Sequence, residues 1–391
     1  MNEGFIEFAR PDYGDAEIAA AAAALASGWT TTGPRTAAFE KAFCEYTGAP
    51  YALGVNSGSA ALHLALVALG IAPGDEVITT PLTFCATVNA ILLAGATPVL
   101  ADIGDDLNIS PDAIRRAIRP RTRAIVPVHM AGLPCDMEAI GRLAGEYGLF
   151  VVEDAAHAAG ASRGSFPNWT RVGAGASDAV AFSFYATKSL STGEGGMITC
   201  QDARLRERMR ILSLHGISHD AWEREDAKDN WAYDVVECGF KYNMSDLVAA
   251  IGLAQLARLD EMNRRRAEIA RAYNAAFAGM PELELPPDSA ESTHAWQLYI
   301  LLLNLGRLRV DRSQFIAAMR RRGVGCSVHF KPIPMHPYYR ERLDISETAC
   351  PRARDEYPRL VSLPLSSRLD DAEVAKVIAA VRDTARTYTC C

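Results

Sequence analysis

Residues 181–196 read AFSFYATKSLSTGEGG, an apolar strand that runs into a lysine and then into a glycine-rich turn. An ordinary surface lysine needs no such setting. A lysine that forms a Schiff base does, because it must sit at a rigid strand end in a partly desolvated pocket that lowers its pKa. Lys188 is therefore the candidate nucleophile of the chain. Ser183, on the preceding strand, could add a hydroxyl to a phosphate site, and the glycines after Lys188 leave room for a ligand near the backbone.

The segment FVVEDAAH at residues 150–157 ends a second apolar strand in a carboxylate. Ligands of parallel sheets bind beyond the carboxyl ends of the strands, so Asp154 would lie at such a site. If a pyridine ring binds there, this carboxylate would keep the ring nitrogen protonated. The alternative is that Asp154 only caps the next helix. His157 shares its helix face and could donate to a ring oxygen, although a histidine of this kind is more often structural.

A third segment, GVNSGSAAL at residues 54–62, follows a strand and opens a helix. Ser57 or Ser59 would be the N-cap, and Gly58 lets the backbone approach a ligand closely. The free N–H groups and the dipole of a helix N-terminus favour a phosphate. Taken alone, the segment is equally well explained as a capped strand–helix turn.

Apolar strands alternate with helical patterns through the first two-thirds of the chain, which predicts an α/β fold with a mostly parallel sheet covered by helices. A long helix from about Asp246 then leads into a smaller α+β domain, and we divide the chain into residues 1–250 and 251–391. The expected strands are 51–55, 76–80, 97–102, 124–128, 149–153, 180–184 and 197–200 in the first part, and 298–303 and 325–330 in the second. The expected helices include 60–69, 110–118, 137–147, 246–273, 311–322 and 370–388.

Composition and charge exclude several classes of function. The 391 residues carry a formal net charge of −7, which argues against nucleic acid or an anionic membrane as the main partner. The nine cysteines show no paired spacing, so a disulfide framework is not expected and a reducing cytoplasm is the simplest location. The alanine run at 19–24 is too short to span a bilayer. We expect a soluble, cytoplasmic protein that holds no metal ion.

The order of the three segments narrows the possibilities. A phosphate loop, a strand-end aspartate and a lysine 34 positions later follow one another as in pyridoxal-phosphate (PLP) enzymes of fold type I, which have a seven-stranded sheet. The chain resembles one family of these enzymes in particular, the DegT/DnrJ/EryC1/StrS sugar aminotransferases, from about Trp29 to Leu365. The motifs that carry the resemblance are GWTTTGP (28–34), NSGSAAL (56–62), PLTFCAT (81–87), EDAAH (153–157), FSFYATK (182–188) and GFKYNMSD (239–246).

The resemblance implies a role for each matching position. Lys188 would hold PLP as a Schiff base and move the proton during transfer, and Asp154 would pair with the ring nitrogen. His157, where many relatives carry glutamine, would bond the ring oxygen, and Phe84 would stack on the ring face. The contacts to the cofactor phosphate would come from Ser57, Gly58, Ser59 and Ser183.

The resemblance also implies a homodimer with shared active sites. In the family, the segment at 239–244 reaches into the neighbouring subunit's site. Lys241 or Asn243 would then contact the partner's cofactor phosphate, and the sequence does not distinguish between the two. The alternative is that this segment is a buried structural loop.

The implied substrates are L-glutamate as amino donor and a keto sugar on a nucleotide diphosphate. Residues 328–339, VHFKPIPMHPYY, occupy the stretch that lines the sugar-nucleotide site in relatives. Together with residues 239–243 and 294–296, they look most like enzymes that aminate C4 of a UDP-4-keto sugar. Residues 162–178 are either a loop near the pocket or solvent-exposed filler. The expected substrate contacts are Thr32, Tyr185, His329 and His336, of which Tyr185 replaces a histidine of several relatives.

Other functions fit the sequence less well. The family also includes aminotransferases for cyclitol and aminoshikimate-type ketones, which stay open as an alternative. Its sugar dehydratases carry histidine at the position of Lys188. A PLP-binding regulator would need an added DNA-binding segment, and the chain has neither the length nor a basic recognition helix for one. The glycine fingerprints of Rossmann and P-loop nucleotide sites are absent.

Overall fold

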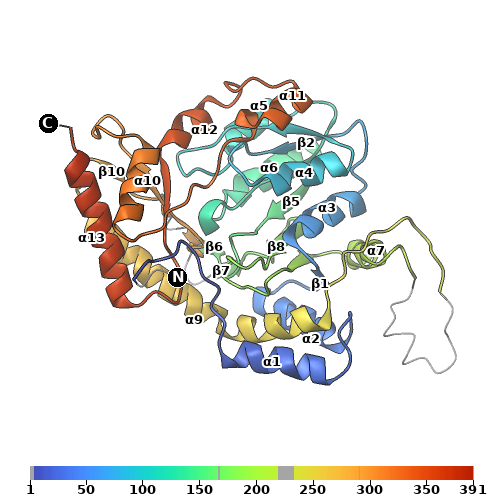
Figure 1. Cartoon of the computed structure of the whole chain (residues 1–391). Coiled ribbons are helices and arrows are strands. Elements are labelled where there is room, and N and C mark those ends of the chain that lie inside the picture. The colour runs from blue at the N-terminus through green and yellow to red at the C-terminus, as the bar shows by residue number, and fades with distance from the viewer. Residues whose placement is uncertain (1–3, 166–167, 219–232, 290, 391) are drawn as a thin grey trace.

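The computed structural model describes residues 4–165, 168–218, 233–289 and 291–390. Its centre is a seven-stranded sheet with the strand order β1-β9-β8-β5-β4-β2-β3 (Figure 1). Neighbouring strands are parallel except for β9, which runs antiparallel to both β1 and β8. The strands are β1 Tyr51–Val55, β2 Glu76–Thr79, β3 Thr97–Leu100, β4 Thr122–Val126, β5 Phe150–Asp154, β8 Ala179–Ser183 and β9 Gly196–Cys200. The predicted α/β fold with a mostly parallel seven-stranded sheet is confirmed.

Helices cover both faces of this sheet. The helices of the first part are α1 Asp15–Ala26, α2 Pro34–Thr47, α3 Gly58–Ala68, α4 Cys85–Leu93, α5 Pro111–Ala117, α6 Met137–Tyr147 and α7 Ala203–Ser213, followed by the long α9 Asp246–Phe277. One core layer joins the sheet to α3, α4 and α7. On the opposite face, α2 and α9 pack under one half of the sheet and α5 and α6 under the other.

Successive residues of one strand therefore enter different layers. In β8, Ala179 and Ala181 belong to the layer of α3, whereas Val180 and Phe182 belong to the layer of α2 and α9. Because both faces are buried, the strands read as continuous apolar runs rather than as alternating patterns. This explains why the strands were recognisable in the sequence, each to within two residues of its observed ends.

The C-terminal part forms a second, smaller layer of strands and helices. A three-stranded antiparallel sheet in the order β10-β12-β13 packs with α10, α13 and the end of α9 around one hydrophobic core, which also includes Ile6. In Figure 1, α10 and α13 stand together on the left beside the C-terminus. The elements are β10 Leu283–Glu284, β12 Tyr299–Leu303, α10 Arg312–Arg321, α11 Pro337–Leu343, α12 Pro351–Glu356, β13 Leu360–Leu363 and α13 Asp371–Tyr388, with short 3₁₀ helices at Met130–Gly132, Ile333–Met335 and Tyr357–Arg359. The division of the chain at residue 250 stays a prediction.

Two expectations for local structure were wrong. Residues 325–330 form no strand; the region makes only isolated bridges, from Val324 to Ile6 and from Ser327 to Ser362. The third strand of the small sheet is instead β13, which pairs with β12. Within 162–178, the strands β6 Ser162–Ser165 and β7 Asn168–Arg171 pair with each other, and β6 pairs with β11 Ser292–Thr293, so residues 162–165 and 168–171 are strands rather than a loop. In both cases the observed structure depends on pairing between strands that are far apart in the sequence, which a local pattern does not show.

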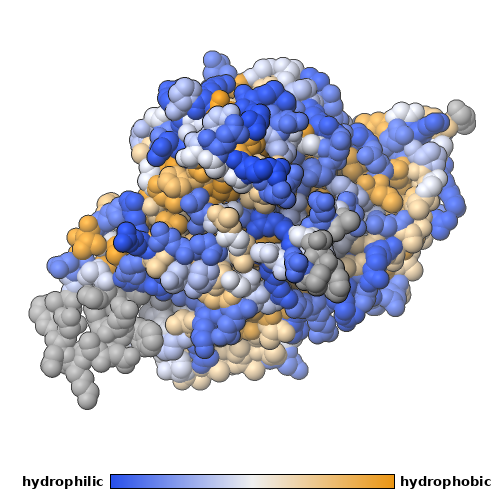
Figure 2. All heavy atoms as spheres, turned by 180° about the vertical axis from the view of Figure 1, so that it is seen from behind, coloured by the Kyte–Doolittle hydropathy of each residue, from blue (hydrophilic) through white to orange (hydrophobic). Residues whose placement is uncertain are grey.

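The face shown in Figure 2 is mostly hydrophilic, with hydrophobic residues gathered in smaller patches. No helix in the described ranges combines the length and the apolar character needed to cross a bilayer. The helices α1, α2 and α9 lie together along the lower edge of Figure 1, where they pack against one another.

The contact between α2 and α9 depends on a glycine. A Cβ at Gly252 would lie 2.5 Å from the ring of Phe39, which is fully buried and cannot move aside. We expect Gly252→Ala to lower the free energy of unfolding by about 1–3 kcal/mol through overpacking. Gly141→Ala is the control, because Gly141 lies in α6 with nothing within 4 Å of an added Cβ. Urea denaturation should show that this control is neutral or stabilising by up to about 1 kcal/mol. Equal stability of both variants would contradict the packing argument.

Candidate active site

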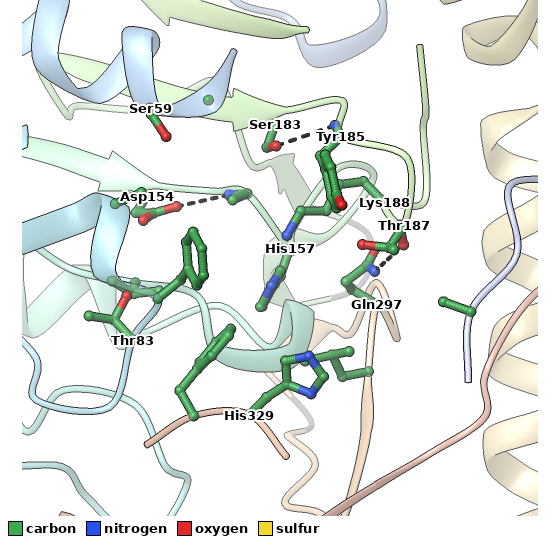
Figure 3. A pocket seen from close by; sticks show the side chains of 18 of the residues that line it. Ser59, Thr83, Asp154, His157, Ser183, Tyr185, Thr187, Lys188, Gln297 and His329 are labelled. Atoms are coloured by element: carbon green, nitrogen blue, oxygen red, sulfur yellow. Dashed lines mark hydrogen bonds between the residues drawn. The ribbon is translucent and has the colours of Figure 1, made fainter. Parts of the chain in front are cut away.

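A cavity of about 520 Å³ lies where β5, β8 and the start of α3 meet (Figure 3). The carboxyl ends of parallel strands form the usual ligand site of such sheets. The cavity is lined by predicted residues from all three motif segments, namely Ser57, Gly58, Ser59, Asp154, His157, Ser183, Tyr185 and Lys188, and also by Phe84 and by His329 from the C-terminal part. The structure thus brings together most of the predicted site.

Lys188 follows β8, and its side chain extends into the middle of the cavity between Asp154 and His157 (Figure 3). Its backbone N–H donates to the carbonyl of Tyr185 at 2.8 Å, which closes a tight turn. Burial lowers the pKa of the amine to about 8, although the Asp154 carboxylate acts in the opposite direction. A far larger fraction of this amine than of an ordinary lysine is therefore neutral, and nucleophilic, near neutral pH.

Asp154 is the last residue of β5 and is buried. One carboxylate oxygen accepts the hydroxyl of Thr87 at 2.8 Å, and the other accepts the N–H of Ala156 at 3.1 Å. Burial raises the pKa of the carboxyl, while these hydrogen bonds and the Lys188 charge oppose the rise. The residues that follow form turns, not a helix, so Asp154 does not act as a helix cap. Its carboxylate faces the cavity.

His157 is buried beneath Lys188, and its ring stacks on Phe330 with 5.8 Å between centroids. Burial holds the pKa of the imidazole well below its ordinary value, and the nearby Lys188 charge adds to this effect. The ring is therefore neutral. Its Nδ1 is buried and finds no hydrogen-bond partner among the described residues. A buried polar atom left without a partner is costly unless a ligand satisfies it.

The first turn of α3 offers the features of an anion site. Ser57 is the N-cap, since its hydroxyl accepts the N–H of Ala60 at 3.1 Å, which decides between the two serines considered. Gly58 is required here because a Cβ would lie 2.7 Å from the Cβ of Ser183. The first N–H groups of a helix have no partner within it and can bind a phosphate. The hydroxyls of Ser59 and Ser183 line the same end of the cavity.

These residues fit pyridoxal phosphate. The α3 N-terminus offers donors for its phosphate, Asp154 a carboxylate for its ring nitrogen, and Lys188 an amine of lowered pKa for its aldehyde. The buried Nδ1 of His157 lacks a partner that a ring oxygen could supply. Phe84 is 59% exposed although it is a large aromatic, and it lines the cavity where a ring could cover it.

Four predicted residues do not line the cavity of their own chain. Lys241 donates to Asn243 at 2.6 Å, and Asn243 donates to the hydroxyl of Thr32 at 2.6 Å, outside the cavity. Lys241 is exposed, so this segment is not a buried loop. His336 instead lies against the carbonyl of Lys331 at 3.2 Å. None of the described residues of 162–178 lines the cavity, although Arg163 pairs with Glu153, the neighbour of Asp154.

Several residues of the site were not found from the sequence. Thr83 and Thr87 belong to the PLTFCAT motif, and their hydroxyls, four positions apart in the sequence, lie 2.8 Å from each other, so that spacing was an available signal. Phe8, Gln297, Leu363 and Leu365 line the cavity from distant parts of the chain. No local pattern marks them.

A second buried carboxylate lies next to Asp154. Glu153 accepts from His129 at 2.7 Å and pairs with Arg163 at 3.2 Å. Burial alone would raise its pKa, but the Arg163 charge and the His129 hydrogen bond outweigh burial and lower the pKa to about 2. Since the Cys135 N–H donates to His129 Nδ1, the histidine carries its proton on Nε2. Arg163 comes from the β6–β7 hairpin, which thus supports the end of β5.

Comparison with known proteins agrees with the family that the sequence motifs indicated. Residues 11–382 match the sequence profile of the DegT/DnrJ/EryC1/StrS aminotransferase family. The spore coat polysaccharide biosynthesis protein SpsC of Bacillus subtilis is 48% identical over 381 residues, which are 97% of each chain. The PLP form of Spr1654 from Streptococcus pneumoniae superposes with a TM-score of 0.89 at 31% identity, over 98% of this chain and 99% of that one. Helicobacter pylori PseC, an aminotransferase of pseudoaminic acid biosynthesis, gives a TM-score of 0.90 at 29% identity, over 99% and 100% of the chains.

The lowered pKa of Lys188 predicts a distinct labelling profile. In protein freed of cofactor, the rate of acetylation of Lys188 by trace acetic anhydride should rise up to about pH 8 and then level off. An ordinary exposed lysine continues to gain reactivity to about pH 10. Lys41, whose side chain is 80% exposed, is the internal comparison. Peptide mass spectrometry gives both rates, and a Lys188 rate that keeps rising to about pH 10 would exclude the lowered pKa.

Proposed function

The chain belongs to the DegT/DnrJ/EryC1/StrS aminotransferase family and is a PLP-dependent aminotransferase of fold type I, and on that premise we propose that it moves an amino group from L-glutamate to a keto sugar carried on a nucleotide diphosphate. The preferred acceptor in this proposal is a UDP-linked 4-keto hexose. The observation that carries the proposal is the meeting of Lys188, Asp154 and His157 in one cavity with the anion site of α3.

When bound, pyridoxal phosphate supplies an aldehyde that takes up the amino group and a protonated ring that withdraws electrons from the substrate carbon. Lys188 would hold the cofactor through Nζ, which its low pKa makes nucleophilic. When free, the same Nζ would take a proton from the substrate carbon that bears the amino group and would return a proton during transfer. One amine thus serves as tether, base and acid.

The other residues of the site would orient and polarise the cofactor ring. Asp154 keeps the ring nitrogen protonated, and its carboxylate is held in place by Thr87 and the N–H of Ala156. His157, neutral because its pKa is lowered, can donate a hydrogen bond to the ring oxygen without adding charge. Phe84, which lines the cavity, would pack against the ring, a contact worth about 0.5–1.5 kcal/mol.

The lining of the cavity suits a hydroxyl-rich acceptor. Tyr185, Glu194 and His329 offer hydroxyl, carboxylate and imidazole groups, and no arginine lines the described cavity. Burial lowers the pKa of His329 to about 4, and its Nδ1 lies 2.8 Å from the Ser362 hydroxyl, so a neutral ring faces the substrate. SpsC and PseC are named for polysaccharide and pseudoaminic acid biosynthesis, which supports a sugar as substrate. We place the reaction in the cytoplasm, where free cysteines such as these persist.

We further propose that the active site is shared between two subunits of a homodimer. Lys188 is the only lysine or arginine among the described residues that line the cavity, although the cofactor phosphate carries negative charge. Lys241 and Asn243 lie outside the cavity on a segment that pairs with the end of β1, immediately before the anion site. In the dimer, these side chains would reach the partner's cofactor phosphate, and Thr32 and His336 would serve the sugar nucleotide.

The assay of choice is release of 2-oxoglutarate from L-glutamate with a panel of acceptors. We expect UDP-linked 4-keto sugars to react faster than UDP-linked 3-keto, dTDP- or GDP-linked sugars and faster than inosose. Lys188→Ala should abolish both turnover and the visible absorbance of the covalently held cofactor, because no other lysine is found among the described residues that line the cavity. Lys41→Ala, at an exposed site, is the control. An active and coloured Lys188→Ala variant would refute the lysine assignment, and a preference for inosose would favour the cyclitol alternative.

Sharing of the site is tested by complementation. Lys188→Ala and the double variant Lys241→Ala/Asn243→Ala should each be nearly inactive as homodimers. Mixed dimers are purified with two different affinity tags. Each contains one site in which Lys188 of one subunit is intact and Lys241 and Asn243 of the other subunit are intact. Such dimers should recover about half of the wild-type activity. If mixed dimers are as inactive as their parents, Lys241 and Asn243 serve the site of their own subunit.

A further inference from the structure

The two residues that flank Lys188 are held by one side chain, that of Gln297. Its Oε1 accepts the backbone N–H of Ser189 at 2.7 Å and the Ser189 hydroxyl at 2.9 Å. Its Nε2 donates to the carbonyl of Thr187 at 2.7 Å, as the dashed line in Figure 3 shows. Gln297 is only 5% exposed, so water competes little with these bonds. The carboxamide therefore clamps the backbone on both sides of the lysine.

This clamp needs a group with a donor on one side and an acceptor on the other. The Thr187 carbonyl can only accept, and the Ser189 N–H can only donate. A carboxylate of the same shape would set an oxygen against the Thr187 carbonyl, and an apolar chain would leave both backbone groups unpaired. The orientation of the amide is therefore determined by its partners.

Gln297 is itself held in place by backbone contacts. The Ala295 N–H donates to the Gly132 carbonyl at 3.0 Å, and the Leu298 N–H donates to the Ala131 carbonyl at 3.2 Å. The same loop starts at His129, whose N–H donates to the Asp154 carbonyl at 3.1 Å. The short loop at residues 129–132 therefore contacts both the segment that carries Gln297 and the backbone of Asp154. Gln297 lies between this contact and β12 of the C-terminal sheet.

We propose that Gln297 is a positioning residue that holds Lys188 where Nζ can reach both the cofactor's aldehyde and the substrate carbon. The inference rests on the role of Lys188 in the proposed function. Gln297 acts through the peptide on either side of the lysine and not as a proton carrier. A displacement of about 1 Å in a reacting group can slow a reaction on the order of 100-fold.

The test compares Gln297→Glu and Gln297→Met with wild type in the full chain. The first readout is the rate at which added pyridoxal phosphate becomes attached to Lys188 in cofactor-free protein, trapped with borohydride and quantified by peptide mass spectrometry. We expect both variants to slow attachment at least about tenfold and to lower kcat by about 100-fold, with a much smaller change in KM for the sugar. Unchanged attachment and kcat in folded variants would overturn the proposal.

Gln255→Met is the matched control for loss of a buried carboxamide. Gln255 is 1% exposed, and it accepts from the Ser191 N–H at 3.2 Å and donates to Glu17 at 2.8 Å. It therefore holds the segment that follows Lys188, but at a position farther from the lysine. If Gln297 acts only through overall stability, both Met variants should lower Tm and slow attachment alike. If it positions Lys188, only the change at Gln297 slows attachment. Should neither Gln297 variant fold, Ser189→Ala removes one of the three bonds and should slow attachment less, in the same direction; an unaltered rate would overturn the proposal.

A double-variant cycle separates positioning from other roles. In the Lys188→Ala background, with ethylamine supplied as a free base, a further Gln297→Glu change should have no additional effect, since there is no side chain left to position. An equal loss in both backgrounds would show that Gln297 acts on something other than Lys188. If wild-type protein attaches the cofactor at Lys188 but aminates no keto sugar, the proposed function fails, while the attachment rates still test Gln297.

Discussion

The register between β5 and β8 is the constraint on which the active site depends. Asp154 stands opposite Ala181, and the Ala155 N–H donates to the Ala181 carbonyl at 2.8 Å. Parallel strands end at the same edge of the sheet, so the carboxylate that ends β5 lies beside the turn that carries Lys188. Side chains of a strand alternate between faces, and a slip of one residue would exchange Asp154 for Glu153. The sheet therefore selects which of two adjacent carboxylates meets the cofactor.

The surroundings of these two carboxylates differ as their roles require. Glu153 faces Arg163 and His129, which satisfy its charge and lower its pKa to about 2. Asp154 receives only a hydroxyl and one backbone N–H, and burial raises its pKa. A buried carboxylate without a full counter-charge is expensive, and a cationic ring nitrogen would relieve that cost. The lowered pKa of Lys188 arises from the same dry cavity. Burial thus prepares both groups for one ligand.

The cavity is completed by segments far from the central sheet. Phe8 reaches it from the N-terminus, and Gln297, His329 and Leu363 reach it from the C-terminal part. The close approach of α3 to β8 and β9 requires glycine at 58 and 196, where a Cβ would lie 2.7 Å from Ser183 and 2.6 Å from the Ser57 carbonyl. The site is therefore a product of packing between layers as much as of the loops that carry its reactive groups. This explains why the small sheet, although remote in sequence, contributes to the position of Lys188.

The amino-acid order alone was enough to identify the strands and the family and to name Lys188, Asp154 and the start of α3 as candidate site residues, because strand runs, capping and motif spacing are local properties. The tertiary structure was needed for Gln297, which bonds a residue 110 positions away, and for Thr87, which bonds one 67 positions away. It also replaced the expected strand at 325–330 by β13 and showed a hairpin in 162–178. Such contacts depend on which distant segments fold against one another, and no local pattern records that. Local sequence motifs therefore predict the candidate reactive residues, whereas long-range packing determines which residues surround and orient them.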